Sequence, residues 1–352
     1  MKRTLSQAFC RFSPHTGFRL TVGSLVLLLA VPFVQAGHSL DPKELRARAL
    51  DFLAPIPDRM PGAEDDTPAR IELGRKLYFE TALSENRTQS CNTCHRVDEF
   101  RGGVDNEATS PGAFGKRGGR NSPTVLNAGF QFVQFWDGRA EDLVEQAKGP
   151  VLNPIEMAMP SEAVVIERLQ SKPHYVEAFA QAFPGVESSL SYGNVARAIA
   201  AFERTLVTRD RFDDFLNGDD QALTAVERRG LDDFLTLGCT TCHYGPVLGG
   251  QSFMKVGLIH SFPTDDKGRF DVTQEEDDEY RFKVPMLRNI ELTHPYFHKG
   301  QIATLEESVR KMGWHQLGLE LSEEQVGSLV AFLRTLTDKE RRAGAQAAAA
   351  SR

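Results

Sequence analysis

Cys91-Asn92-Thr93-Cys94-His95 and Cys239-Thr240-Thr241-Cys242-His243 are two copies of one pattern, Cys-x-x-Cys-His. This pattern is typical of covalent attachment of a c-type haem. The two thiols of each copy can form thioethers with the two vinyl groups of one haem, and the adjacent imidazole then serves as the proximal ligand of the iron. The sequence therefore predicts two covalently bound c-type haems, with His95 and His243 as proximal ligands.

Zinc sites and redox-active dithiols also use paired cysteines. The separation between Cys94 and Cys239 far exceeds the spacing of a zinc ribbon. A thioredoxin-like pair requires alternating strands and helices around the motif, and neither motif has that context. Haem attachment is the favoured interpretation.

The first 36 residues carry basic residues, no acid, and an apolar run from Val22 to Val34 followed by Gln35-Ala36. This pattern predicts a cleavable secretory signal, cut near Ala36, and therefore an exported protein. The run is shorter than the about 20 residues of a membrane-spanning helix, so we expect no membrane span after cleavage. Cleavage also removes Cys10 and leaves only the haem cysteines.

The chain has 352 residues and a formal net charge of −7, and loss of the basic leader makes it more acidic. This charge argues against nucleic acid and anionic membranes as partners. It suits a small basic redox protein that docks by electrostatic attraction, although solubility alone would also explain it. The length and the 41% of hydrophobic residues predict two domains with separate cores.

Helix signals dominate the sequence, and long alternating strand patterns are nearly absent. Thr67-Pro68 is typical of an N-cap followed by proline at the first helical position, and it predicts a helix to Tyr78. Capping boxes predict three further helices, which begin after Thr224, Thr304 and Ser322 and end near residues 237, 312 and 336. Other helices are expected over residues 141–148, 162–170 and 194–206.

A similar amphipathic segment precedes each haem motif, residues 72–79 and 229–235, and forms a weak internal repeat. We therefore predict a mainly α fold of two tandem cytochrome c-like helical domains, each carrying one haem. The expected parts are a signal peptide (1–36), an N-terminal haem domain (37–206), a C-terminal haem domain (207–337) and a flexible or loosely docked tail (338–352).

The ligand on the far face of each iron decides between electron transfer and chemistry on a bound small molecule. Residues 96–135 offer the first haem no ordinary distal ligand, so we expect it to be five-coordinate, with a ligand from the other domain as the alternative. For the second haem, spacing leaves Met286 and Met312 both open. The wider set of candidates also includes Met254, His260, His294, His298 and His315.

Several further stretches together resemble the bacterial di-haem cytochrome c peroxidases, and the resemblance runs from about Leu73 to Leu336. They are residues 120–128, 135–139, 145–150, 282–289 and 295–300. The resemblance implies periplasmic reduction of hydrogen peroxide to water with electrons from a small cytochrome c or a cupredoxin. It also implies that His95 holds the peroxidatic haem, and that His243 and Met312 hold the electron-transfer haem.

The same resemblance assigns catalytic roles to three side chains. Glu156 matches the distal acid/base, which would move a proton from one peroxide oxygen to the other. Gln146 matches the amide beside it, and Trp136 matches a tryptophan between the haems that relays electrons. A surface glutamate and a core tryptophan are the plainer interpretations of the isolated residues.

The resemblance also suggests a calcium site and a different resting state of the first haem. Asn121, Thr293 and Pro295 match calcium-binding positions, two of which use backbone carbonyls. Many members of the family carry a histidine in the loop before the Arg-Asn-x-Pro stretch that caps the resting peroxidatic haem, and Ala113 occupies that place here. We therefore expect a permanently open first haem. The family often forms dimers, so a homodimer is also a candidate.

Two other functions stay open at this point. A MauG-like di-haem enzyme would oxidise residues of a partner protein, but such enzymes typically place a tyrosine where this chain has Met312. A plain di-haem electron carrier would need two fully ligated irons, and Gln146 and Glu156 argue against it.

Overall fold

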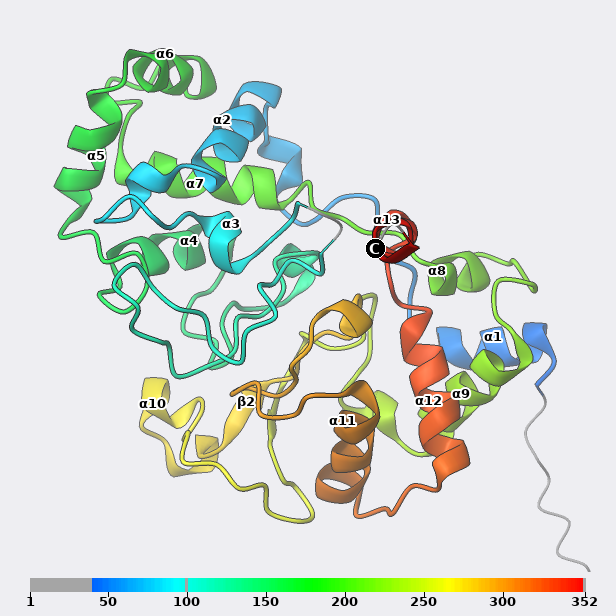
Figure 1. Cartoon of the computed structure of the whole chain (residues 1–352). Coiled ribbons are helices and arrows are strands. Elements are labelled where there is room, and N and C mark those ends of the chain that lie inside the picture. Colours follow the sequence, from blue (N-terminus) through cyan, green and yellow to red (C-terminus); the bar gives the residue numbers. More distant parts are fainter. Residues whose placement is uncertain (1–39, 99–100, 351–352) are drawn as a thin grey trace, which may run out of the picture. The chain divides into compact units, whose positions relative to one another are not determined.

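The computed structural model describes residues 40–98 and 101–350, and within this part no helix is long and apolar enough to cross a membrane. The predicted signal peptide lies outside the described residues. The fold is mainly helical, as predicted (Figure 1). Its helices are α1 Pro42–Leu50, α2 Pro68–Tyr78, α3 Cys91–Cys94, α4 Leu143–Leu152, α5 Glu162–Gln170, α6 Pro173–Ala182, α7 Tyr192–Glu203, α8 Arg211–Leu216, α9 Ala225–Thr236, α10 Phe270–Thr273, α11 Leu305–Met312, α12 Glu323–Arg334 and α13 Lys339–Ala350. Strands β1 Phe253–Lys255 and β2 Arg281–Lys283 pair antiparallel.

The helix starts follow the capping signals of the sequence. The side chain of Thr67 accepts a hydrogen bond from the amide of Arg70 at the start of α2. Capping boxes open α9 and α12, and the side chain of Thr304 caps α11. Helix α5 has the predicted bounds. Helix α4 begins two residues later than predicted and continues to Leu152, past Pro150.

The sequence patterns do not predict helices α1, α6, α8, α10 and α13, nor the π-helical turn at Gly313–Leu317 directly after α11. Helix α13 lies in the predicted tail, and there Arg341 donates hydrogen bonds to the backbone oxygens of Val97 and Arg101.

The internal repeat corresponds to two pairs of packed helices, α2 with α7 and α9 with α12 (Figure 1). Each pair crosses at a glycine. A Cβ atom on Gly74 would lie 1.8 Å from the carbonyl oxygen of Ala198, and one on Gly230 would lie 1.8 Å from that of Ser328. The glycines thus allow backbone-to-backbone contact within each pair. Helices α2 and α9 each precede one haem motif in the sequence.

Replacing Gly230 by alanine is expected to destabilise the protein by about 1 to 3 kcal/mol or more, as in an overpacked core. The new methyl group would meet a backbone oxygen, and no change of rotamer can relieve that contact. Gly327 lies in α12 with no atom within 4 Å of its would-be Cβ, so Gly327→Ala is the matched control. The control should stabilise by up to about 1 kcal/mol, through helix propensity. Thermal unfolding of both haem-loaded variants measures the difference, and equal melting temperatures would contradict the packing argument.

Two large hydrophobic clusters form the core. One joins buried residues between Leu73 and Phe202, and the other joins residues between Phe212 and Leu336 with Leu45, Ala49 and Leu53 of the α1 region. The α1 region therefore packs against the C-terminal helices. Arg288 and Asp210 form a buried ion pair, in which Arg288 binds both carboxylate oxygens of Asp210 at 2.6 and 2.7 Å.

Candidate active site

The first haem motif lies at the wall of a large cavity. Helix α3 carries Cys91 and Cys94, and His95 caps its C-terminal end. The cavity is also lined by Gln146 from α4, Glu156 from the turn that follows α4, and Trp136. The structure therefore brings together, around one cavity, the thiols, the imidazole and the three predicted catalytic side chains of the N-terminal half.

Both motif histidines are oriented by the backbone. The Nδ1 atom of His95 lies 3.0 Å from the carbonyl oxygen of Pro123, and Nδ1 of His243 lies 3.1 Å from that of Leu248. With Nδ1 engaged, Nε2 is left to bind a metal, which is the usual arrangement of a metal-binding imidazole. Burial also lowers the pKa of both histidines, so each is held as the neutral, ligating form.

The four motif cysteines line the two cavities, Cys91 and Cys94 in one, Cys239 and Cys242 in the other. Burial raises the pKa of Cys94 to about 11 and that of Cys239 to about 12. Each cavity therefore presents two cysteines for attachment beside one oriented imidazole, and this set of residues fits a c-type haem.

Glu156 is half-buried on a rigid turn. Its amide donates to the carbonyl oxygen of Asn153 at 3.0 Å, and the Asn153 side chain donates to its carboxylate at 2.8 Å. Burial raises the pKa of Glu156 above its ordinary value of 4.5, while the positive charge of Arg139 and the bond from Asn153 act in the opposite direction. A carboxyl group whose pKa is raised by burial and whose position is fixed by a hydrogen bond is suited to proton transfer.

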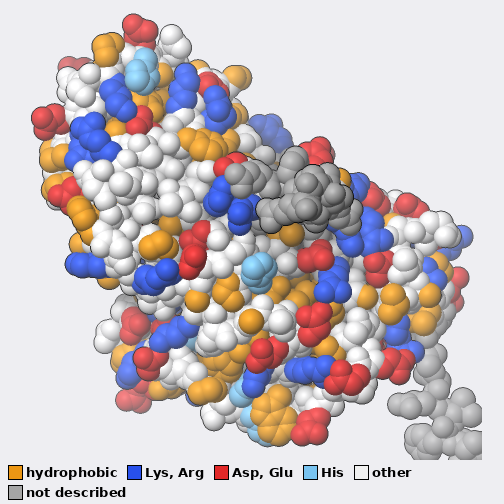
Figure 2. Space-filling model, viewed as in Figure 1, with side chains coloured by type: hydrophobic (Ala, Val, Ile, Leu, Met, Phe, Trp, Pro, Cys, Tyr) orange, Lys and Arg blue, Asp and Glu red, His pale blue; other side chains and the backbone are white. Residues whose placement is uncertain are grey.

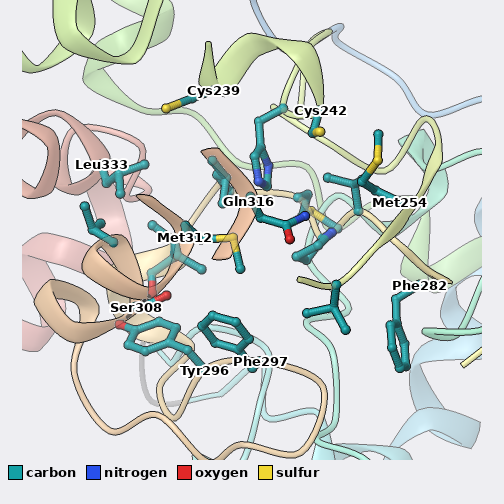
Figure 3. Close-up of a pocket in the computed structure, with 18 of the residues that line it drawn as sticks. Cys239, Cys242, Met254, Phe282, Tyr296, Phe297, Ser308, Met312, Gln316 and Leu333 are labelled. Carbon is teal, nitrogen blue, oxygen red and sulfur yellow. Dashed lines mark hydrogen bonds between the residues drawn. The ribbon is translucent and has the colours of Figure 1, made fainter. Parts of the chain in front are cut away.

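The second motif lines a mostly apolar cavity, shown in Figure 3. Cys239 and Cys242 lie along one side of it, and Met312 projects into it from the end of α11. Met254 and Met286 line the same cavity, so the geometry keeps three methionines near the second haem motif. Carboxylates are absent from the described lining of this cavity, in contrast to the cavity around His95.

Trp136 lines both cavities. Its indole Nε1 donates to the carbonyl oxygen of Asn121 at 2.8 Å, and its ring meets that of His298 edge-on at 6.4 Å. The neighbouring Asp137 is bound by Arg120 at 2.5 Å, and Arg120 also pairs with Asp266 at 2.7 Å. These contacts hold the indole in the wall that the two cavities share.

Asn121, Thr293 and Pro295 all line the cavity around His243. The side-chain amide of Asn121 donates to the carbonyl oxygen of Glu107 at 2.9 Å, and the hydroxyl of Thr293 donates to that of Ile290 at 3.2 Å. Within the described part of the chain, no cluster of three or more His, Cys, Asp or Glu side chains could hold a metal ion. Any cation held here would therefore depend on carbonyl and amide oxygens.

Ala113 lies directly behind Glu156. Its amide donates to the carbonyl oxygen of Glu156 at 2.7 Å, and its own carbonyl oxygen accepts from Asn86. Ser110, Pro111 and Gly112 line the cavity around His95, whereas Ala113 does not. At Gly112 a Cβ atom would lie 1.7 Å from the carbonyl oxygen of Ile155, so glycine is required for this close approach.

Sequence reasoning gave no role to several charged residues of these cavities, among them Arg139, Glu203 and Lys283. Arg139 and Glu203 line the cavity around His95, and Lys283 lines the one around His243. Lys283 is buried and donates to the carbonyl oxygen of Val133 at 3.1 Å, and burial lowers its pKa to about 7. Arg139 and Lys283 lie in stretches that carried the family resemblance, and position within those stretches was the available signal.

Comparison with known proteins agrees with this geometry. The sequence profile of the di-haem cytochrome c peroxidases matches residues 68–221. The chain is 45% identical to the cytochrome c551 peroxidase of Pseudomonas aeruginosa, over 92% of this chain and 93% of that protein. The chain belongs to the di-haem cytochrome c peroxidase family. It is therefore an oxidoreductase of the peroxidase class, as the family resemblance implied.

Two further comparisons extend this finding. The cytochrome c551 peroxidase of Nitrosomonas europaea is 43% identical, over 90% of this chain and 91% of that protein. The crystal structure of a MauG-like protein associated with microbial copper homeostasis superposes with a TM-score of 0.73 at 30% identity, covering 81% of this chain and 94% of that one. The chain is thus similar in fold to a MauG-like protein as well.

Proposed function

We propose that this protein reduces hydrogen peroxide to water in the periplasm and that its two covalently bound haems have different tasks. The haem at His95, in the N-terminal domain, is the peroxide site. The haem at His243, in the C-terminal domain, takes electrons from a small donor protein. The supporting observation is the difference between the two cavities, since one is lined by a carboxyl and an amide side chain and the other by methionines.

When bound, the haem at His95 supplies the iron that binds peroxide and delivers electrons to it. Glu156 accepts the proton of one peroxide oxygen and returns it to the other, so that the departing oxygen leaves as water rather than hydroxide. Gln146 orients the peroxide through its amide, which cannot titrate. Asn153 holds the Glu156 carboxylate by a 2.8 Å hydrogen bond and fixes the direction of its free oxygen.

Electrons pass from the cavity around His243 to that around His95 by way of Trp136, which lines both. Met312, which lines the cavity around His243, would hold the electron-accepting haem together with His243. A methionine ligand raises the potential of a c-type haem and therefore favours electron uptake from a donor. Asn121, Thr293 and Pro295, which line the cavity around His243, would hold a calcium ion, a cation that prefers oxygen ligands.

The donor is a small cytochrome c or a cupredoxin, and the relatives in Pseudomonas and Nitrosomonas are named for cytochrome c551. The net charge of −7 favours a basic donor. On the face drawn in Figure 2, acidic and basic side chains are interspersed. Docking to such a face would depend on apolar contact as well as on charge. A homodimer is compatible with this arrangement.

Steady turnover tests the proposed function. The haem-loaded protein, supplied with reduced small cytochrome c, should oxidise it in proportion to the peroxide added, two electrons for each peroxide. The alternative function is oxidation of residues in a partner protein, and the structural likeness to a MauG-like protein is the reason to test it. Slow cytochrome oxidation together with peroxide-dependent modification of a partner would favour that alternative.

The rate of peroxide reduction is expected to fall at acidic pH. Glu156 must be ionised to accept a proton, and its pKa is raised by burial, so kcat/KM for peroxide should be lost as pH falls through a value above the ordinary 4.5 of glutamate. Arg139→Gln removes a positive charge that lowers this pKa, and it should move the acid limb to higher pH. Arg139→Lys keeps the charge and is the control. An acid limb at the same pH in all three proteins would contradict the role of Arg139.

The fully ferric protein is expected to react with peroxide without prior reduction. By the family resemblance, Ala113 stands at the place of the histidine that caps the resting haem in many members, and its methyl group cannot bind iron. Stopped-flow mixing with peroxide should therefore change the Soret band of the ferric enzyme within the first turnover. The matched variant Ala113→His should slow this reaction until the second haem is reduced. A ferric wild-type enzyme that is inert to peroxide would refute the open-haem proposal.

A further inference from the structure

Glu203 is a buried acid without a partner in the cavity around His95. It is the last residue of α7, its side chain lines this cavity, and only 5% of its surface is exposed. Within residues 40–98 and 101–350, no hydrogen bond to its carboxyl group is found. The proposed mechanism assigns it no task, yet isolated acids are rarely buried in this way.

The charges around Glu203 do little to stabilise its ionised form. The facing groups are Tyr78 from α2, Cys91 from α3 and Arg204, the next residue in the chain. Arg204 is engaged elsewhere, because both oxygens of Asp66 bind it at 2.6 and 3.0 Å, and Asp142 also acts on it. A carboxylate at the C-terminal end of a helix is further disfavoured by the helix dipole. Burial raises the pKa of Glu203 to about 8.

We propose that Glu203 binds a proton when the haem at His95 gains an electron, and releases it when that electron leaves. One electron enters from the donor, and one proton from water converts the carboxylate into the carboxylic acid; oxidation reverses both transfers. The inference rests on the proposed function, since it requires a haem in this cavity. Its physical reason is that an added charge is costly in a buried site, and a proton on Glu203 cancels it.

Spectroelectrochemical titration of the haem at His95 tests the coupling without measuring turnover. In the wild-type protein the reduction potential should fall as the pH rises through about 8. The slope should reach up to about 59 mV per pH unit, the value for one proton coupled to one electron. Glu203→Gln keeps the shape of the side chain but cannot titrate, so its potential should be nearly independent of pH in this range. Glu167→Gln, an exposed acid on α5, removes the same charge and should retain the wild-type slope.

Glu203→Asp is a second variant that tests the inference if Glu203→Gln fails to bind haem. It keeps a carboxyl group in the cavity and should shift the pH range of the slope rather than abolish it. A slope that persists unchanged in Glu203→Gln would assign the proton to another group, such as a haem propionate or Glu156, and overturn the inference. If the wild-type protein turns over peroxide but its reduction potential does not depend on pH, the role of Glu203 is wrong and the proposed function stands. If the protein does not turn over peroxide, the proposed function is wrong.

Discussion

Replacing Glu156 by glutamine is expected to lower kcat/KM for hydrogen peroxide by about 100- to 10,000-fold, the usual contribution of a positioned proton-transfer group. The glutamine can still accept the hydrogen bond from Asn153 at the same place, so the turn after α4 should keep its geometry. The lost function is proton transfer between the two peroxide oxygens. Stopped-flow reaction of the haem-loaded variant with peroxide measures the loss directly, without the donor.

The matched control for Glu156→Gln is Glu145→Gln. Glu145 lies exposed on α4, next to Gln146, and pairs with Lys148 on the surface. Its replacement changes the net charge by the same amount and should leave kcat/KM within about twofold, because exposed ion pairs contribute little. Equal effects of the two variants would mean that Glu156 acts through overall charge, and an unchanged rate in Glu156→Gln would remove it from the mechanism.

Local signals allowed much of the helical framework to be predicted. The capping boxes at Thr224 and Ser322 each act over three residues, so the sequence alone contains both partners of the interaction. The haem motifs are equally local, because thiols and imidazole lie within five residues. Gly74 and Gly230 lie in the two similar segments that indicated the repeat. Their contact with a second helix depends on residues far along the chain and could not be predicted from either segment.

Features that depend on distant contacts could not be predicted. Helix α1 is stabilised by packing of Leu45 and Ala49 against C-terminal helices, and the sequence around it gives no sign of this partner. Glu203 lies in a helix whose pattern predicts only a buried face, and its position in a cavity wall depends on the packing of α7 against α2 and α4. For Trp136, the family resemblance implied a place between the haems, whereas the sequence alone was equally compatible with a core residue.

Replacing Met312 by histidine is expected to lower the reduction potential of the haem at His243 by on the order of 0.2 V, because an imidazole ligand gives up the high potential that the thioether confers. At about 59 mV per tenfold change, this corresponds to an equilibrium constant for electron entry roughly 1,000-fold less favourable. Turnover with a high-potential cytochrome should therefore almost stop. Direct reaction of the ferric haem at His95 with peroxide should continue, since its cavity is not lined by Met312.

Three methionines line the cavity around His243, so matched variants decide which of them is the ligand. Met254→Leu and Met286→Leu conserve volume and should leave the potential unchanged if Met312 binds iron. A large shift of the reduction potential in Met286→Leu, with no shift in Met312→His, would identify Met286 as the ligand. Met286 is buried in a small cluster with Ile56, Met60 and Val247, which gives it a packing role that needs no iron, whereas Met312 ends α11 at the cavity. This difference in surroundings is why we expect the potential to follow Met312.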